Sequence, residues 1–343
     1  MGARSVQPRT VAGRHIVVAD PAMADLYERV QSRVGRVQLP VLLRGESGSG
    51  KEILAHWLHE SSSRGEGPFI AINCAALPEH LVESELFGYV AGAFSGAERE
   101  KAGLFEAADG GTLFLDEVAE LSPNAQAKLL RVLDDRRVRR LGETTERPLD
   151  VRIVAATYRN LERAVRRRKF RRDLYFRFKG VVLHIPPLRE RPRELELLAR
   201  TFVEQHAERA GLPPPSWSPA GLRALREHRW PGNIRELAAA CGHLVATVES
   251  GGEIHPEHLH AWTEGVPEPH ATSDIGTVDI DALPRKAKEG PFRPIAEEIA
   301  ELERTRMKEA LEAAKGNRTL AAQLISMPQR TFTAKLRTHA LVR

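Results

Sequence analysis

The sequence predicts an α/β fold in which a parallel sheet lies between helices, followed by two smaller helical parts. Three observations predict it. Short apolar segments alternate with helical stretches from about residue 14 to residue 185, as strands and helices do in layered α/β proteins. Pro186-Pro187 ends this alternation, and from Arg193 to about Trp262 apolar residues recur at helical spacing. A last helical block follows Ile295. The candidate strands are 41–43, 69–72, 113–115, 151–155 and 181–183.

These patterns divide the chain into five parts. The segment after the first helical part is rich in Pro, Gly, Asp and Thr, with few aromatic residues, and is predicted to be a flexible linker. Only about a dozen residues precede the α/β part. We therefore expect control from a partner, from expression level or from a portion outside this chain. The parts are an N-terminal extension (1–13), the α/β part (14–185), the first helical part (186–262), the linker (263–292) and the C-terminal helical block (293–343).

Composition favours a soluble protein of the cytoplasm without a membrane partner. Of the 343 residues, 42% are hydrophobic and 28% charged, as in ordinary globular domains. No apolar run approaches the roughly 20 residues that span a bilayer, and the N-terminus lacks a signal peptide. Cys74 and Cys241 lie far apart and fit reduced, buried thiols. The net charge is +5, yet residues 315–343 hold six Lys or Arg and no acid, which favours contact with nucleic acid.

A glycine-rich loop lies between the first candidate strand and a helix, which is the context of a phosphate-binding loop. Its backbone N–H groups would cradle phosphates, and Lys51 would reach the β and γ oxygens. Glu52 stands where Ser or Thr usually binds Mg²⁺, so more of the metal's coordination should fall on Asp116. The predicted nucleotide-binding residues of this loop are Gly45, Glu46, Ser47, Gly48, Ser49, Gly50, Lys51 and Glu52.

Two acids end the apolar strand at 113–115. Strand alternation should point the side chains of Asp116 and Glu117 to opposite sides, which suits Asp116 to Mg²⁺ and Glu117 to the attacking water as a base. An ordinary acidic strand end is the alternative. The sequence has no Asn-Lys-x-Asp segment that would read guanine, which favours ATP over GTP.

A hexapeptide between the loop and the acids has an aromatic residue between paired glycines. This pattern predicts a tight, mobile turn that holds Phe94 in the open, where a partner would cover it. A hairpin whose Phe94 folds back into the core is an equally open alternative. The segment consists of Gly92, Ala93, Phe94, Ser95, Gly96 and Ala97, and we call it the finger.

The basic C-terminus has the pattern of a helix-turn-helix. A helix over 318–325 should pack through Ala321, Ala322, Leu324 and Ile325, and a second helix over 329–339 should face inward with Phe332 and Leu336. The second helix would enter the major groove; a merely solvated basic helix is the alternative. An upstream helix carrying Ile295, Ile299, Leu302, Met307 and Leu311 could pair two chains. The predicted DNA-binding residues are Arg318, Thr319, Gln329, Arg330, Thr331, Thr333, Lys335 and Arg337.

Taken together, these motifs resemble the bacterial enhancer-binding proteins, the AAA+ activators of sigma-54 RNA polymerase that end in a Fis-type helix-turn-helix. The resemblance covers about residues 14–262 and resumes in the last fifty. It implies an AAA+ P-loop ATPase with a helical lid subdomain and a small all-α DNA-binding domain. The segments that carry it are 45–52, 73–76, 85–88, 92–97, 111–117, 170–174, 186–191 and 230–237.

The resemblance also implies partners and residue roles. It implies a hexameric ring, dimeric when inactive, with ATP and Mg²⁺ between neighbouring subunits, that acts on sigma-54 RNA polymerase from an upstream DNA element. Asn73 matches the switch residue that restrains Glu117. Arg171 and Arg177 match arginine fingers that reach into the neighbour's site, where guanidinium groups suit a phosphoryl group in transfer. Arg235 matches the nucleotide sensor of the lid, for which a surface helix-capping arginine is the alternative.

Two residues depart from the family pattern. Ser95 replaces the usual Thr of the finger, which keeps the hydroxyl group and drops a methyl. Tyr158 replaces the usual Asn of the first sensor, which leaves Thr157 to couple nucleotide state to finger movement. Glu52 follows the family's own habit. Two other hypotheses stay open: a remodelling AAA+ ATPase of another class with the tail as a tether, and a DNA-binding regulator whose ATPase is vestigial.

Overall fold

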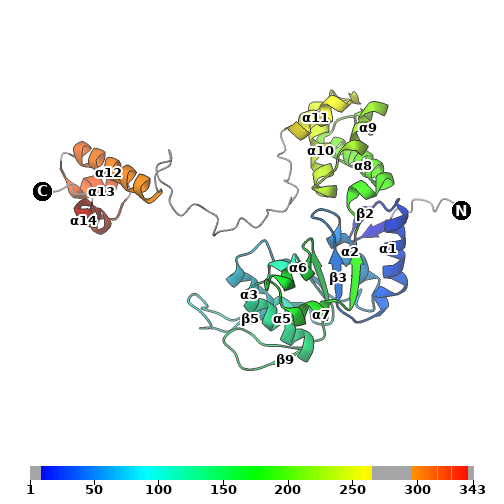
Figure 1. Cartoon of the computed structure of the whole chain (residues 1–343), viewed down its shortest axis with the longest axis horizontal. Coiled ribbons are helices and arrows are strands. Elements are labelled where there is room, and N and C mark those ends of the chain that lie inside the picture. The colour runs from blue at the N-terminus through cyan, green and yellow to red at the C-terminus, as the bar shows by residue number, and fades with distance from the viewer. Residues whose placement is uncertain (1–8, 265–294, 315, 326, 339–343) are drawn as a thin grey trace. The chain divides into compact units, whose positions relative to one another are not determined.

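The chain folds into two compact units, Met1–Pro269 and His270–Arg343, which are treated separately below (Figure 1). The structure is a computed structural model, and it describes residues 9–264, 295–314, 316–325 and 327–338. The predicted linker therefore lies outside the described residues, except for 263 and 264, which belong to the last helix of the first unit. Within the described residues, no helix combines the length and the apolar character that crossing a membrane requires.

The centre of the first unit is a five-stranded parallel sheet, as predicted. Its strands lie in the order β11-β3-β10-β7-β4. The three central strands are almost fully buried, and every residue of β10 is buried, which explains why the sequence shows them as short runs without alternation. All five candidate strands are confirmed. They are β3 (Val41–Arg44), β4 (Phe69–Asn73), β7 (Thr112–Asp116), β10 (Arg152–Thr157) and β11 (Val181–His184).

Helices cover the two faces of this sheet with separate hydrophobic cores (Figure 1). One core includes α1 (Pro21–Ser32), α2 (Lys51–Glu60) and the 3-10 turn η1 (Val34–Arg36). A capping residue marks the start of α5 (Pro123–Asp135). The hydroxyl group of Ser122 accepts a hydrogen bond from the amide of Ala125, and Pro123 occupies the first helical position. The other core includes α3 (Glu79–Phe87), α4 (Leu104–Ala107), η2 (Val118–Glu120), α5 (Pro123–Asp135), α6 (Leu161–Arg166) and α7 (Arg172–Phe178).

Short strand pairs extend this framework. The strands β1 (Arg9–Val11) and β2 (Arg14–Ile16) form an antiparallel hairpin, and the predicted boundary after residue 13 falls in its turn. The finger lies between two further strands, β5 and β6. The other pairs are β5 (Gly88–Tyr89) with β6 (Lys101–Ala102), and β8 (Arg137–Val138) with β9 (Arg147–Pro148).

The helical lid follows the sheet and has its own core around the fully buried Trp230. The predicted helical periodicity is confirmed, and β12 (Ser216–Trp217) pairs in parallel with β13 (Glu253–Ile254) beside the helices. Both cysteines are buried and form no disulfide, Cys74 directly after β4 and Cys241 in the lid, and burial raises the pKa of each thiol to about 12. The lid elements are η3 (Leu188–Glu190), α8 (Pro192–Ala210), α9 (Pro219–Glu227), α10 (Asn233–Thr247) and α11 (Pro256–Glu264).

The second unit contains α12 (Ile295–Ala313), α13 (Arg318–Leu324) and α14 (Gln329–Thr338). Ala321, Ala322, Phe332 and Leu336 form its core as predicted, and Ile325 packs against it. Leu324 was predicted to pack but is 56% exposed, as is Leu320 one turn earlier at 45%, because these two residues lie on the same side of α13, beside its buried face. On α12, Met307 is fully buried inside the unit, whereas Leu311 packs against the same core and stays partly exposed, so the pairing of two chains through this helix stays a prediction. The side chains of Ile295, Ile299 and Leu302 lie outside the described part.

Candidate nucleotide site and partner surfaces

The phosphate-binding loop connects the end of β3 to the start of α2. Gly48 and Gly50 have φ angles of 72° and 100°, a region that glycine adopts without strain. Gly48 also lies under the lid, because a Cβ there would come within 2.2 Å of the carbonyl oxygen of Gly232. The loop thus ends at a helix N-terminus, where backbone amides and the helix dipole favour phosphate.

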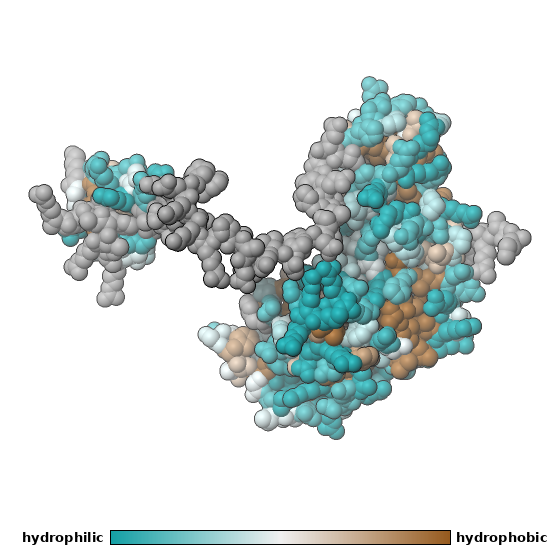
Figure 2. All heavy atoms as spheres, viewed as in Figure 1, coloured by the Kyte–Doolittle hydropathy of each residue, from teal (hydrophilic) through white to brown (hydrophobic). Residues whose placement is uncertain are grey.

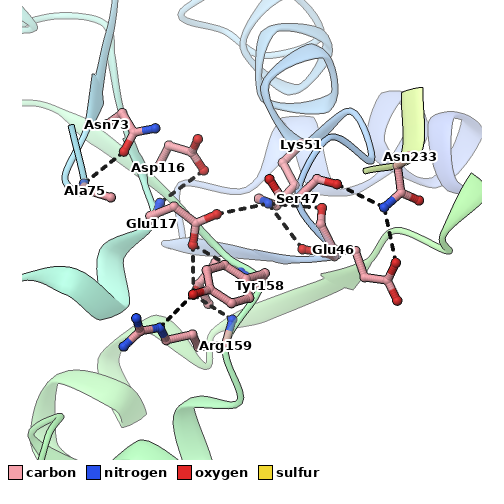
Figure 3. A network of polar contacts seen from close by, with 12 residues as sticks. Glu46, Ser47, Lys51, Asn73, Ala75, Asp116, Glu117, Tyr158, Arg159 and Asn233 are labelled. Carbon is pink, nitrogen blue, oxygen red and sulfur yellow. Dashed lines mark hydrogen bonds and ion pairs between the residues drawn. The ribbon is translucent and has the colours of Figure 1, made fainter. Parts of the chain in front are cut away.

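Lys51 joins this loop to the acid pair (Figure 3). Only 6% of the residue is exposed. Its ammonium group donates to the carbonyl oxygens of Gly45 and Glu46, each at 3.2 Å, and lies 3.2 Å from Oε1 of Glu117. The structure therefore brings together the lysine and the carboxylate that the sequence assigned to phosphate binding and to water activation.

Glu117 lies directly after β7 and is held by residues at the end of β10. Its Oε2 accepts hydrogen bonds from the hydroxyl group of Thr157 at 3.4 Å and from the amide of Tyr158 at 3.3 Å. The argument from strand alternation was wrong for this residue, because β7 ends at Asp116 and Glu117 has a left-handed backbone with φ 53°. Asn73 Oδ1 accepts from the amide of Ala75 at 2.9 Å, so its restraint of Glu117 stays a prediction.

Asp116 has the features of a cation ligand. Burial raises the pKa of its carboxyl group; Lys51 opposes this shift and Glu117 adds to it, so a divalent cation would relieve the crowding of negative charge. Glu52 is exposed on the first turn of α2. Within the described residues no group of three or more His, Cys, Asp or Glu could hold a metal, so phosphate oxygens and water would have to complete the coordination of Mg²⁺.

Ser49 gives independent evidence of a missing polar partner. The residue is 1% exposed, and its hydroxyl group has no hydrogen-bond partner among the described residues. Buried hydroxyl groups are rarely left unpaired. The loop, its two left-handed glycines and this hydroxyl group fit a nucleotide phosphate.

The lid contacts four successive residues of the phosphate loop. The sequence predicted a role for Arg235, whose Nη1 donates to the hydroxyl group of Ser47 at 3.2 Å. It did not predict the other three contacts, which involve residues of the motifs at 186–191 and 230–237. Arg189 pairs with Glu46, the amide of Ile234 donates to the carbonyl of Gly48 at 3.0 Å, and Arg191 Nη2 donates to the carbonyl of Ser49 at 2.9 Å.

Tyr158 takes part in the site only through its backbone. The residue is 53% exposed, and its phenol oxygen accepts from Nε of Arg159 at 3.1 Å. Arg159 in turn forms an ion pair with Glu120 at 2.6 Å. Since the contacts to Glu117 come from Thr157 and from an amide that any residue at 158 would offer, the departure from the usual Asn leaves this part of the site in place.

The two predicted arginine fingers lie on the surface of α7 and its N-terminal cap. Arg171 forms a bidentate ion pair with Asp173, and Arg177 pairs with Asp134. Both guanidinium groups are about half exposed. Within the described residues neither contacts the phosphate loop of its own chain, which fits groups that serve a different subunit.

A network that the sequence analysis missed ties α7 to the strand before the phosphate loop. Glu162 on α6 pairs with Arg44 at the end of β3 and accepts a hydrogen bond from the phenol group of Tyr175 at 2.8 Å. The hydrogen bond from Arg44 is the main cause that lowers the pKa of Glu162 to about 2. Because Tyr175 lies between Arg171 and Arg177, this network fixes the helix that carries both.

The finger is a tight, exposed turn. The amide of Gly92 donates to the carbonyl oxygen of Ala97 at 2.8 Å. The amide of Ala97 donates to the carbonyl oxygen of Phe94 at 3.0 Å. Phe94 is 46% exposed, with its ring edge-on to Tyr89 at a centroid distance of 4.9 Å. Figure 2 shows apolar side chains at the outer end of this loop. The exposed aromatic is confirmed and the buried alternative is wrong, although Ala97 itself is 6% exposed.

The helix-turn-helix exposes four of the eight residues predicted to contact DNA. Arg318, Thr319, Gln329 and Thr331 are exposed. The amide group of Gln329 donates to the hydroxyl group of Thr319 at 2.8 Å, which joins the starts of α13 and α14. Thr333 and Lys335 are half-buried on α14. The side chains of Arg330 and Arg337 lie outside the described part.

Three family models match the chain in order: the sigma-54 interaction domain at residues 16–184, the AAA+ ATPase lid domain at 189–275, and the bacterial regulatory protein, Fis family, at 298–339. The chain belongs to the sigma-54 activator family. The resemblance of its motifs and the predicted fold class are thereby confirmed. The chain is an AAA+ ATPase of that family with a DNA-binding helix-turn-helix, which sets aside an ATPase of another remodelling class.

Relatives and solved structures agree with this assignment. The DNA-binding transcriptional regulator NtrC of Salmonella typhimurium is 41% identical over 323 residues, which cover 92% of this chain and 68% of that protein. NtrC of Escherichia coli is 39% identical, covering 96% and 72%. The crystal structure of Brucella abortus NtrX in complex with ADP has a TM-score of 0.67 at 30% identity, covering 95% of this chain and 70% of that one. A second structure of NtrX, with ATP, has a TM-score of 0.65.

Proposed function

We propose that this chain activates sigma-54-dependent transcription by binding an upstream DNA element and hydrolysing MgATP in a ring of six copies. Hydrolysis moves the finger against sigma-54 and converts the closed polymerase complex to the open one. The observation that carries the proposal is the coexistence, in one sigma-54 interaction domain, of the Lys51–Glu117 contact and an exposed Phe94.

The nucleotide chemistry follows from the positions of the site residues. Lys51 and the backbone of the phosphate loop bind the β and γ oxygens, and Asp116 would hold Mg²⁺, which would supply positive charge against the transferred phosphoryl group. Glu117 takes a proton from water, whose oxygen bonds to the γ-phosphorus as the bond from that phosphorus to the β–γ bridging oxygen breaks and ADP leaves. The products are ADP and inorganic phosphate. Arg235 contacts the loop from the lid and senses which nucleotide it holds.

The proposed ring completes a site that one chain leaves incomplete. Arg171 and Arg177 are exposed on α7, and a guanidinium group from a neighbouring copy stabilises the charge on the γ-phosphoryl group, with a typical gain of about 10³–10⁵ in rate. The Glu162 network would link the position of Arg171 and Arg177 to the phosphate loop of their own chain. Signals could then pass around the ring from one site to the next.

The helix-turn-helix recognises the upstream DNA site. Exposed Arg318, Thr319, Gln329 and Thr331 surround the start of α14, the end of a recognition helix that usually contacts base edges in the major groove. Basic residues beside it contact phosphates and position the protein without reading sequence. Bound upstream, the chain would reach the polymerase with its finger.

Reconstituted transcription tests this proposal. The full chain, ATP and a supercoiled template should give open complexes with sigma-54 polymerase and none with polymerase that carries the ordinary sigma factor. Omission of ATP should abolish open complexes. Lys51→Ala should abolish both ATP binding and open complexes. Activation of the ordinary holoenzyme without ATP hydrolysis would instead support a regulator with a vestigial ATPase.

A further inference from the structure

An ion pair and a buried amide join the lid to the phosphate loop. Both carboxylate oxygens of Glu46 accept hydrogen bonds from Arg189, at 2.8 and 2.7 Å. Asn233 donates to the same carboxylate at 3.2 Å and to the carbonyl oxygen of Ser47 at 2.9 Å (Figure 3). We call Glu46, Arg189 and Asn233 the lid joint. Glu46 lies in the loop, whereas Arg189 and Asn233 lie in the lid.

Asn233 fixes the first turn of α10. It is fully buried, and its φ angle of 53° is left-handed, a conformation that asparagine tolerates better than most residues. Its Oδ1 accepts from the amide of Leu188 at 2.8 Å, beside Arg189. One side chain therefore binds both lid segments that touch the loop. Ile234 and Arg235 follow it directly, and their contacts to Gly48 and Ser47 depend on where this turn lies.

The two halves of the lid joint differ in how easily they can open. Glu46 and Arg189 have side chains that are 42% and 40% exposed, so their pair can separate without leaving a charge buried in the protein. Asn233 has no exposed surface, and separation would remove both loop acceptors of its amide group, which would keep only the carbonyl oxygen of Pro231 at 3.4 Å. The pair is thus the adjustable part of the joint, and the amide is its fixed part.

We propose that Glu46 and Arg189 are positioning residues for ATP binding: their pair holds the lid, and with it Arg235, closed over the phosphate loop. This inference rests on the proposed ATPase function. Its consequence is a population effect. When only a fraction of molecules has the lid closed, the apparent affinity for ATP falls by that fraction, while turnover of the closed, loaded site stays the same. Loss of the pair should therefore raise KM for ATP more than it lowers kcat.

The experiment compares Glu46→Gln, Arg189→Gln and the double variant of the full chain. Glutamine at position 46 keeps an oxygen that can accept from Asn233 but removes the charge. KM for ATP should rise about threefold to fivefold in each single variant, the range of an exposed bidentate pair, with kcat within twofold. The double variant should be no worse than either single one, because all three lack the same pair. Arg189→Lys should fall between wild type and Arg189→Gln.

A matched control removes an ion pair that lies wholly inside the lid. Arg226 and Glu196 pair across α9 and α8, with 52% of the arginine side chain exposed, and neither contacts the loop in the described structure. Glu196→Gln should leave KM unchanged. An unchanged KM in the joint variants would overturn the inference, because a purely structural brace changes the melting temperature alone. Effects on KM that multiply in the double variant, or an equal rise of KM in the control, would also overturn it.

Failure of the proposed ATPase function can be told apart from failure of the lid joint. Direct titration with ADP measures nucleotide affinity without turnover. A wild-type chain that binds ADP but does not hydrolyse ATP would contradict the ATPase and leave the joint testable by the same variants. ADP affinity equal in wild type and in all three variants would contradict the joint.

Discussion

Replacement of Glu117 by glutamine should separate ATP binding from hydrolysis. In the structure Glu117 accepts hydrogen bonds from Thr157 and from the amide of Tyr158, and the amide oxygen of glutamine can accept both. Lys51 keeps its two carbonyl partners and remains free to bind phosphate. What the variant loses is the basic oxygen that would take a proton from water. We therefore expect hydrolysis to fall by about 10²–10⁴, the usual contribution of a general base.

The same change has a calculable effect on stability. Lys51 and Glu117 are almost fully buried, and removal of one partner from a buried ion pair typically costs about 3–5 kcal/mol. Two carbonyl acceptors still surround the ammonium group, so we expect a smaller loss, about 1–2 kcal/mol in the free energy of unfolding. ATP should restore this stability by supplying phosphate charge to Lys51.

Phosphate release measures ATP hydrolysis and calorimetric titration measures ATP binding, both on the same preparation. Glu120→Gln is the matched control, because Glu120 lies three residues away and pairs with Arg159 outside the nucleotide site. It should hydrolyse ATP at the wild-type rate. Hydrolysis within threefold of wild type in Glu117→Gln would refute the assigned base, and loss of ATP binding would refute the separation of roles.

Three further predictions concern other parts of the molecule. Arg171→Ala should bind ATP normally but hydrolyse it about 10³-fold more slowly. Wild-type turnover in this variant would show that Arg171 is not an arginine finger. Glu162 has a folded pKa of about 2, below the usual 4.3, so its stabilisation is present above about pH 4.3 and is lost as pH falls towards 2. Because the side chain is 36% exposed, Glu162→Gln should cost only about 1 kcal/mol at neutral pH and flatten acid unfolding; identical acid curves would contradict this. Lys335→Ala should weaken binding to all duplexes equally and reduce the salt slope by about 1, and a sequence-selective loss would assign it to base readout.

The local features of the fold could be predicted from the sequence. The five strands, the phosphate loop and the buried faces of the helix-turn-helix each depend on neighbours within a few residues, and apolar runs or helical spacing reveal them. The acids after the apolar strand were found in the same way. The prediction for Leu324 was wrong because this residue lies at the edge of the buried face of α13, beside the exposed Leu320, and spacing alone does not show how wide that face is.

The contacts between distant segments could not be predicted. Glu46 and Arg189 are 143 residues apart, and Arg44 and Glu162 are 118 apart. No periodicity or spacing connects such pairs, since only the parallel order of the strands and the return of the lid bring them together. Glu117 differs for a local reason: the left-handed turn after β7 redirects its side chain, and alternation within a strand does not extend to a residue beyond it.

The central claim is that energy from ATP hydrolysis reaches sigma-54 through the finger. The most direct test measures ATP hydrolysis and open-complex formation by Phe94→Ala, with Leu212→Ala, which removes a similarly exposed apolar side chain from the lid, as the control. The account predicts wild-type hydrolysis in both variants and loss of open complexes in Phe94→Ala alone. Normal open-complex formation by Phe94→Ala, or loss of hydrolysis in parallel with it, would contradict the claim.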